Sequence, residues 1–252
     1  SRRRHTRCSR DWSSDVCSSD LQANRVLQPR INIDQVIGVF AGLRPLVANK
    51  KESDTTKLSR EHTVDRPVPG FVSLAGGKYT TYRVMAEDAV DMATNDITKL
   101  VGESTTEKLP IIGADGFWAL EQQVDVIAAE YGLKSETVTH LLDRYGSEIS
   151  EIMKMIQTDR KLAAPVIREL PYLKAELVYA VTHEGAMSIA DVMERRTRIW
   201  FEASDYGLAS VNSVADVIAP HLGWKAAQKR ASIAEYKDLV KRAKTSAASS
   251  HK

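Results

Sequence analysis

The sequence has almost no cysteine. Its two cysteines, Cys8 and Cys17, lie near the start, and neither has histidine, aspartate or another cysteine at the spacing of metal ligands. The rest of the chain contains no thiol. We therefore expect no disulfide bond, no cysteine-based catalysis and no metal site.

Long apolar runs and an excess of one charge are also missing. No window approaches the roughly 20 consecutive apolar residues that a membrane-spanning helix needs, and no apolar stretch follows the basic start as a secretory signal would. The chain has 35 Lys and Arg against 33 Asp and Glu, so its charge does not indicate a nucleic-acid partner. Because 43% of the residues are hydrophobic, the chain can still form a substantial core.

The beginning of the chain differs from the rest. Residues 1–21 have five arginines in their first ten positions and then a Ser/Asp-rich run, with no helical or strand periodicity. They resemble translated sequencing-adaptor contamination, and we expect an artefactual or disordered segment. A basic arm for RNA, DNA or anionic lipid is the alternative. Since there is no initiator Met and regular patterning starts only around Gln22, we expect an upstream portion of the natural protein to be missing.

A glycine pair separates an expected strand from an expected helix. The apolar run 70–75 predicts a strand that stops at Gly76 and Gly77, and the apolar spacing over 84–97 predicts a helix with Thr80 and Thr81 as N-cap candidates. Such a hinge directs unpaired backbone N–H groups and the positive end of the helix dipole at one point. The turn suits a phosphate or an anionic flavin, although an ordinary strand-to-helix connection has the same pattern. Neither the GxGxxG fingerprint nor the GxxxxGK[ST] phosphate loop occurs in the chain.

Two arginines precede this hinge. Arg44 follows an apolar strand expected at 36–40 and lies in a Gly/Pro turn, where a guanidinium without an anionic partner would be costly to bury. Arg60 lies between Ser59 and Glu61. A structural salt bridge for Arg44 and simple solvation for Arg60 account for the pattern as well as a ligand does.

The C-terminal half predicts an all-helical domain. Helical breakers separate its amphipathic segments, which we expect at 118–131, 137–156, 173–183, 189–202, 214–222 and 227–243. His183 and Glu184 lack the second histidine of a zinc helix, and the charges of 190–198 can pair along one helix, so both features favour structural roles.

Three motifs in order, GLRPL (42–46), LSREH (58–62) and LAGGKYTTYRVMAEDAVD (74–91), resemble a segment of the FAD-dependent, respiratory glycerol-3-phosphate dehydrogenases. The resemblance continues through LPIIGADG, HLLDRYG, LVYAVTHEGAMSIADVMERRTRI and APHLGW, and it is to the actinobacterial form. It covers nearly everything from residue 35 to residue 237.

The resemblance implies roles for the residues that match the family's motifs. Arg44 and Arg60 would hold the phosphate and hydroxyl side of the substrate, which suits a forked guanidinium. Lys78 would reach the substrate and, with Arg44, stabilise the developing alkoxide. The catalytic base and the FAD fingerprint would lie upstream, and His62 is not assigned as that base. The residues that the resemblance places against FAD are Gly76, Gly77, Lys78, Tyr79, Thr80 and Thr81.

The resemblance also implies an organisation and a reaction. The fold would be α+β, with the end of a D-amino-acid-oxidase-like FAD and substrate domain at 22–108, a helical cap at 109–243 and a disordered tail at 244–252. The reaction would oxidise sn-glycerol 3-phosphate to dihydroxyacetone phosphate and pass electrons to quinone. We expect a fragment that is inactive alone, a partner in the missing FAD half, self-association through the cap, and a cytoplasmic location peripheral to the inner face of the membrane. The alternatives are a non-catalytic helical binding module and another D-amino-acid-oxidase-type flavoenzyme.

Overall fold

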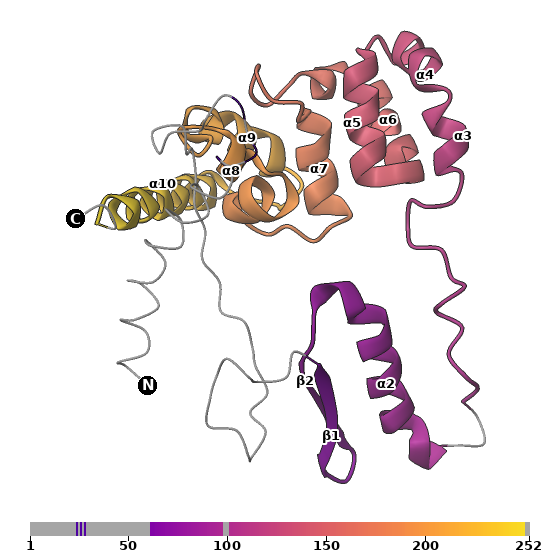
Figure 1. The fold of residues 1–252 in the computed structure, drawn as a ribbon. Helices are drawn as coiled ribbons and strands as arrows, with labels where there is room; N and C mark the ends of the chain where they lie inside the picture. Colours follow the sequence, from indigo (N-terminus) through magenta and orange to yellow (C-terminus); the bar gives the residue numbers. More distant parts are fainter. Residues whose placement is uncertain (1–23, 25, 27, 29–60, 98–100, 250–252) are drawn as a thin grey trace. The chain divides into compact units, whose positions relative to one another are not determined.

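The computed structural model describes residues 24, 26, 28, 61–97 and 101–249, and these residues are mostly helical with one small two-stranded sheet (Figure 1). The chain divides into two compact units, with a boundary between Ile111 and Ile112. The strand expected at 36–40 lies outside the described residues, as do Arg44 and Arg60. No helix in the described part is long and apolar enough to cross a membrane.

The first unit, here called the hairpin–helix unit, is described over 61–97 and 101–111. Strands β1 (His62–Val68) and β2 (Phe71–Gly76) pair antiparallel, with a register irregularity between Asp65 and Val68. The strand expected at 70–75 is β2. Strand β1 was not expected, because charged residues and Pro67 interrupt its apolar alternation.

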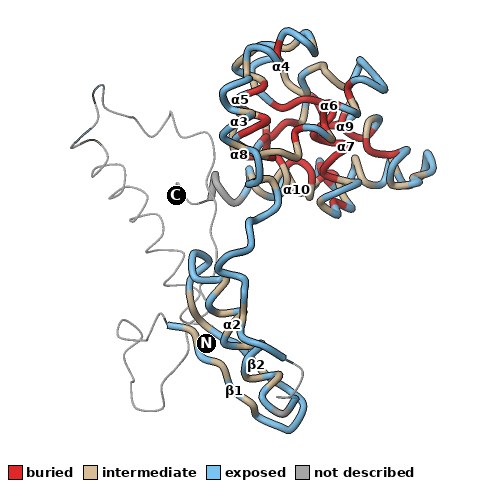
Figure 2. Tube along the Cα trace, turned by 90° about the vertical axis from the view of Figure 1, so that its right-hand side faces the viewer, coloured by how far each residue is buried: buried red, intermediate tan, exposed pale blue. Residues whose placement is uncertain are grey.

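A helix follows the hairpin, as the sequence predicts. A 3₁₀ turn at Tyr79–Thr81 leads into α2 (Tyr82–Thr94), which contacts both strands. None of the described residues of this unit is buried, whereas the helical unit has red, buried segments throughout (Figure 2). The hairpin–helix unit therefore has no core of its own among its described residues.

The second unit, here called the helical unit, is described over 112–249. It contains no strand ladder within that range. Its helices are α3 (Phe117–Glu121), α4 (Val124–Tyr131), α5 (Ser135–Tyr145), α6 (Ile149–Thr158), α7 (Lys174–Thr182), the π-helical segment Asp191–Arg196, α8 (Ile199–Glu202), α9 (Val211–Ile218) and α10 (Ala226–Ser249).

Helix α7 lies between two hydrophobic cores. Ala175 and Tyr179 pack into the core made with α4, α5 and α6, while Leu177 and Ala180 pack into the core made with α8, α9 and α10. Residues 175–180 are all buried, because the two cores and a set of polar side chains around Glu176 cover the helix. Helix α7 thus joins the two halves of the helical unit.

Three predicted helices are interrupted. The segment expected at 118–131 breaks into α3 and α4 at Gln122 and Gln123, and the segment expected at 137–156 breaks into α5 and α6. The segment expected at 189–202 breaks at Thr197 and Arg198, between the π-helical segment and α8. At the second break Gly146 has φ +56°, and Ser147 N–H donates to the Gly113 carbonyl oxygen at 2.9 Å. A side chain at Gly146 would collide with the Gly113 backbone, so glycine is required at this turn.

The C-terminal helix is longer than expected. Helix α10 continues to Ser249, although the sequence placed a disordered tail from residue 244. Lys244, Ala247 and Ala248 are strong helix formers, and they favour the continuation of the helix.

Candidate functional site

The glycine hinge of the hairpin–helix unit has the backbone that its sequence suggests. Gly76 and Gly77 both have φ +81°, a left-handed conformation that other residues rarely adopt. A Cβ on Gly77 would lie 2.6 Å from Met85 Sδ and 3.1 Å from His62 Cβ. Glycine at 77 is therefore explained by the close packing of α2 and β1 against the hinge, before any ligand is considered.

The residues after the glycines face solvent. Lys78, Thr80 and Thr81 are exposed, and Tyr79 is 91% exposed. The Tyr79 ring lies 6.1 Å from that of Tyr82, centre to centre. The hinge therefore presents a cation, a phenol and hydroxyl groups from one short segment.

The threonines do not cap α2 in the expected way. The Thr81 hydroxyl and N–H both donate to the Lys78 carbonyl oxygen at 3.0 Å, which closes a 3₁₀ turn, and no side chain caps the start of α2. The N–H groups of Gly77 and Lys78 donate to no other residue within the described part of the chain. They stay available to an anion or to polar atoms of a cofactor.

A histidine–aspartate pair holds α2 against β1. His62 Nε2 lies 2.6 Å from Asp88 Oδ2, and a hollow of about 500 Å³ beside the pair is lined by Val64, Asp91 and Met92 among others. The pair lies close to the hinge, because His62 pairs with Gly76 across the two strands and a Cβ on Gly77 would lie 3.1 Å from His62 Cβ. It fixes the angle between hairpin and helix, a role that the LSREH motif did not reveal.

The predicted substrate arginines stay predictions. Arg44 and Arg60 lie outside the described residues, so the structure brings together only the 76–81 part of the predicted site.

A buried polar cluster in the helical unit was missed by the sequence analysis. Glu176 on α7 is fully buried and accepts hydrogen bonds from Leu173 N–H at 2.7 Å, from the Tyr145 hydroxyl at 3.0 Å and from His140 Nε2 at 3.1 Å. Arg144 Nε lies 3.5 Å from the same carboxylate, as an ion pair without hydrogen-bond geometry. We call these residues the Glu176 cluster.

The Glu176 cluster joins α5 to α7 and to the turn before it. Burial and the nearby Glu176 charge raise the pKa of the Tyr145 hydroxyl, which keeps it protonated as a donor. The Arg144 guanidinium also donates to the Arg196 carbonyl oxygen, and Arg196 donates to the Glu184 carbonyl oxygen at 2.8 Å. The only sequence signal was a glutamate within the apolar segment of α7.

His183 and Glu184, which the sequence analysis weighed as an acid–base or metal pair, both contact other residues of the helical unit. His183 stacks on Tyr179 at 4.4 Å, and burial raises the pKa of Glu184 despite the opposing charges of Arg144 and Arg196. No group of three or more His, Cys, Asp or Glu that could hold a metal occurs among the described residues.

The charges of 190–198 pair largely as expected, but on a π-helical segment. Arg195 pairs with Asp191 at 2.8 Å, whereas Arg198 pairs with Glu202 at 3.3 Å instead of Glu194. The buried Thr197 donates to the Val192 carbonyl oxygen at 2.8 Å and ends the segment.

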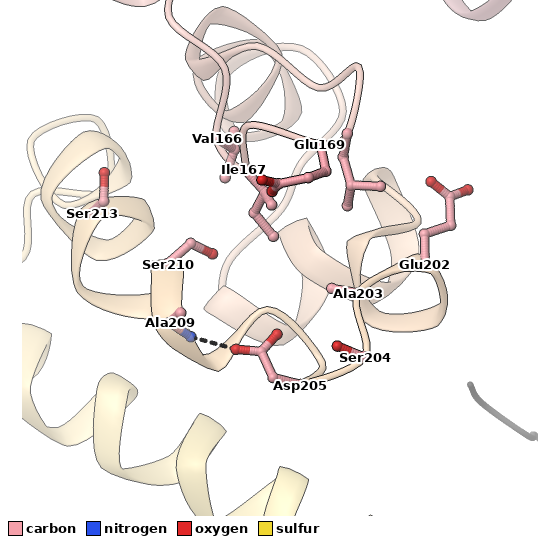
Figure 3. A pocket seen from close by; sticks show the side chains of 11 residues that line it. Val166, Ile167, Glu169, Glu202, Ala203, Ser204, Asp205, Ala209, Ser210 and Ser213 are labelled. Atoms are coloured by element: carbon pink, nitrogen blue, oxygen red, sulfur yellow. Dashed lines mark hydrogen bonds between the residues drawn. The ribbon is translucent and has the colours of Figure 1, made fainter. Parts of the chain in front are cut away.

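A hollow of about 580 Å³ lies in the helical unit, between 166–170 and the segment that joins α8 to α9 (Figure 3). Two of its three acidic side chains are occupied within the fold. Asp205 accepts from the N–H groups of Gly207 and Ala209 at 2.8 Å, and Glu202 accepts from the Tyr172 hydroxyl at 3.0 Å. The third, Glu169, is exposed and has no hydrogen bond or ion pair within the described residues, so nothing holds it in place for a ligand.

Comparison with known proteins gives a consistent result. Residues 104–229 match the family described as the C-terminal domain of alpha-glycerophosphate oxidase. Glycerol-3-phosphate dehydrogenase 2 of Mycobacterium tuberculosis is 45% identical over 236 residues, which are 90% of this chain and 40% of that protein. Glycerol-3-phosphate dehydrogenase of Mycobacterium leprae is 45% identical over 240 residues, 91% of this chain and 41% of that protein.

A more distant relative also matches this chain over part of its length. The mitochondrial glycerol-3-phosphate dehydrogenase of Homo sapiens is 33% identical over 193 residues, 75% of this chain and 26% of that protein. The chain thus spans about two fifths of the length of its mycobacterial relatives.

Proposed function

The chain belongs to the family of the C-terminal domain of alpha-glycerophosphate oxidase, and from this we propose that it is the C-terminal part of an FAD-dependent glycerol-3-phosphate dehydrogenase. The observation that carries the proposal is the 45% identity to mycobacterial dehydrogenases over 90% of the chain. The reaction is oxidation of sn-glycerol 3-phosphate to dihydroxyacetone phosphate, with electrons passing to quinone.

The residues of the hinge fit a flavin and an anionic substrate. Gly77 and Lys78 have N–H groups that no described residue accepts, and Lys78, Tyr79 and Thr80 are exposed. The bound FAD supplies the acceptor for the hydride that leaves C2 of the substrate. Gly76, Gly77, Lys78, Tyr79, Thr80 and Thr81 would hold the flavin, and Lys78 would also reach the substrate.

The cations of this chain bind and polarise the substrate. Lys78 and Arg44 stabilise the negative charge that develops on O2, while Arg44 and Arg60 hold the phosphate through forked hydrogen bonds. The base that removes the O2 proton lies upstream of this chain, and the chain alone does not turn over.

The two units have different tasks in this proposal. Residues 22–108 complete the FAD and substrate domain, and 109–243 form a helical cap that also joins two copies of the protein. The assembled enzyme is cytoplasmic and associates peripherally with the inner face of the membrane.

The proposal is tested by restoring the missing part. Residues 22–252 are fused to the FAD-fingerprint portion of a close relative, flavin content is measured by absorbance, and dye reduction is followed with glycerol 3-phosphate. We expect Lys78→Ala to lower kcat/KM about a hundredfold, because a donor that stabilises a developing oxyanion contributes about 10²–10³ to the rate. Arg44→Ala should also abolish most of the activity.

The matched control is Lys108→Ala, which removes an exposed lysine from the same unit away from the hinge. It should leave kcat/KM unchanged. A flavin-loaded fusion that ignores glycerol 3-phosphate would overturn the substrate, and full activity of the Lys78→Ala fusion would overturn the assignment of the hinge.

A further inference from the structure

Helix α10 has a line of cations along one side. Arg230, Lys237, Lys241 and Lys244 are all exposed, and at about 100° per residue they lie within about 60° of one another around the helix axis. They extend along about 21 Å of the helix. We call these four residues the basic stripe.

A side of α10 centred roughly 100° from the basic stripe around the helix axis is fixed to the helical unit. Tyr236 and Val240 are each 1% exposed, and the Tyr236 hydroxyl donates to the Tyr206 carbonyl oxygen at 2.6 Å. Ile233 and Leu239 pack against the same core, and α10 lies beside α9 (Figure 1). The helix therefore cannot rotate, and the basic stripe stays exposed beside the packed side.

The charges of the basic stripe are not neutralised by ion pairs within the described part of the chain. Arg242, on another side of α10, pairs with Asp238 at 3.1 Å. Lys244 Nζ lies 5.7 Å from the centre of the Tyr206 ring, a contact that leaves its positive charge in place.

The rest of the helical unit has the opposite charge. Residues 112–224 contain 17 Asp and Glu against 10 Lys and Arg, whereas residues 225–249 contain 7 Lys and Arg against 2 Asp and Glu. A negatively charged surface is repelled by the first segment and attracted by α10. We therefore expect an anionic partner to bind the helical unit at α10.

We propose that the basic stripe of α10 docks the protein onto an anionic lipid surface. Three of its four residues are lysines, which are compact hydrated charges, whereas base recognition favours forked or amide side chains. The small residues Ala226 and Ala234 flank the stripe, and they offer no ring for base stacking. A line of charges is sufficient for a layer of lipid headgroups. This proposal rests on the membrane association proposed above and names the surface that makes it, and it does not depend on the reaction.

The test is partition of the full 252-residue chain onto vesicles, measured by co-sedimentation. We expect binding to an equal mixture of phosphatidylcholine and phosphatidylglycerol, none to phosphatidylcholine alone, and weaker binding at high salt. Arg230→Glu, Lys237→Glu and Lys241→Glu combined should lower the partition coefficient at least about tenfold, because each such cation contributes about fivefold.

The matched control is Lys134→Glu, Lys161→Glu and Arg168→Glu combined, which makes the same change in net charge at exposed residues away from α10. This variant should keep the parent's partition coefficient. The Arg-rich first ten residues are present in all three proteins, so they cannot create a difference between them. Circular dichroism establishes that the variants are equally helical.

Three results would overturn the proposal. They are absence of binding that requires phosphatidylglycerol, an equal loss in the two triple variants, and stripe-dependent binding to duplex DNA without binding to vesicles.

Discussion

At the scale of single residues, Glu176 is the most constrained side chain of the helical unit. Its carboxylate is fully buried and has polar partners on α5 and at the N-terminus of α7. Removing one member of a buried charged set leaves the others without compensation in a site that water does not reach. Burial and the charge of Glu202 likewise raise the pKa of Tyr172 to about 12, which keeps that neighbouring hydroxyl a donor.

We expect Glu176→Gln to destabilise the helical unit by about 3 kcal/mol, because Arg144 and His140 then lose their anionic partner. Urea denaturation followed by circular dichroism measures this change. Glu130→Gln, which alters an exposed carboxylate on α4, is the control and should change the unfolding free energy by less than about 0.5 kcal/mol. Equal stability of the two variants would show that the Glu176 cluster is not a stabilising junction.

At the scale of secondary structure, periodicity located the elements but not their breaks. The apolar spacing of 137–156 continues across Gly146, yet the chain turns there because the Gly113 backbone approaches from a distant segment. Nothing in the sequence around Gly146 indicates the contact with Gly113. The hinge was predictable, because Gly76 and Gly77 are paired glycines at the end of an apolar run.

Side-chain hydrogen bonds stabilise the start of the π-helical segment in 188–202. The Asp191 carboxylate accepts from the N–H groups of Met187 and Ser188 at 3.1 Å, and Asp191 N–H donates to the Ser188 hydroxyl at 3.0 Å. Burial alone would raise the pKa of Asp191, but these hydrogen bonds and the Arg195 guanidinium hold it below its usual value. The ionised form is therefore favoured in the folded protein.

A lowered pKa fixes the sign of the pH dependence. The stabilisation from the Asp191 charge is present above the usual aspartate pKa and is lost as pH falls through the lower folded-state value. We expect Asp191→Asn to lower Tm by about 2–4 °C at pH 7, which corresponds to about 1 kcal/mol, and the difference from the parent to be smaller at pH 3. Thermal melts at pH 7 and pH 3 measure the difference in Tm. Asp143→Asn, which changes an exposed aspartate, is the control. A difference that persists unchanged at pH 3 would mean that the charge is not responsible.

At the scale of the whole molecule, the two units differ in how they are stabilised. The helical unit has two cores joined by α7, whereas none of the described residues of the hairpin–helix unit is buried. Apolar side chains of that unit face solvent, with Phe71 and Val90 each 55% exposed. Sequence patterning predicted its helix and one strand, but it could not show that their packing leaves no enclosed interior, because burial depends on which other segments cover them.

Local stability should follow this difference in burial. Free energies of local opening are small where few apolar groups are enclosed, so we expect the amides of α2 to exchange with deuterium at least about tenfold faster than those of α7. Hydrogen exchange with mass spectrometry on peptides covering the two helices measures this. In the flavin-loaded fusion the α2 amides should become slower while the α7 amides stay unchanged, because under the proposed function the added FAD portion completes the domain to which the hairpin–helix unit belongs. Equal protection of α2 in the chain alone and in the fusion would contradict the view that this unit completes a larger domain.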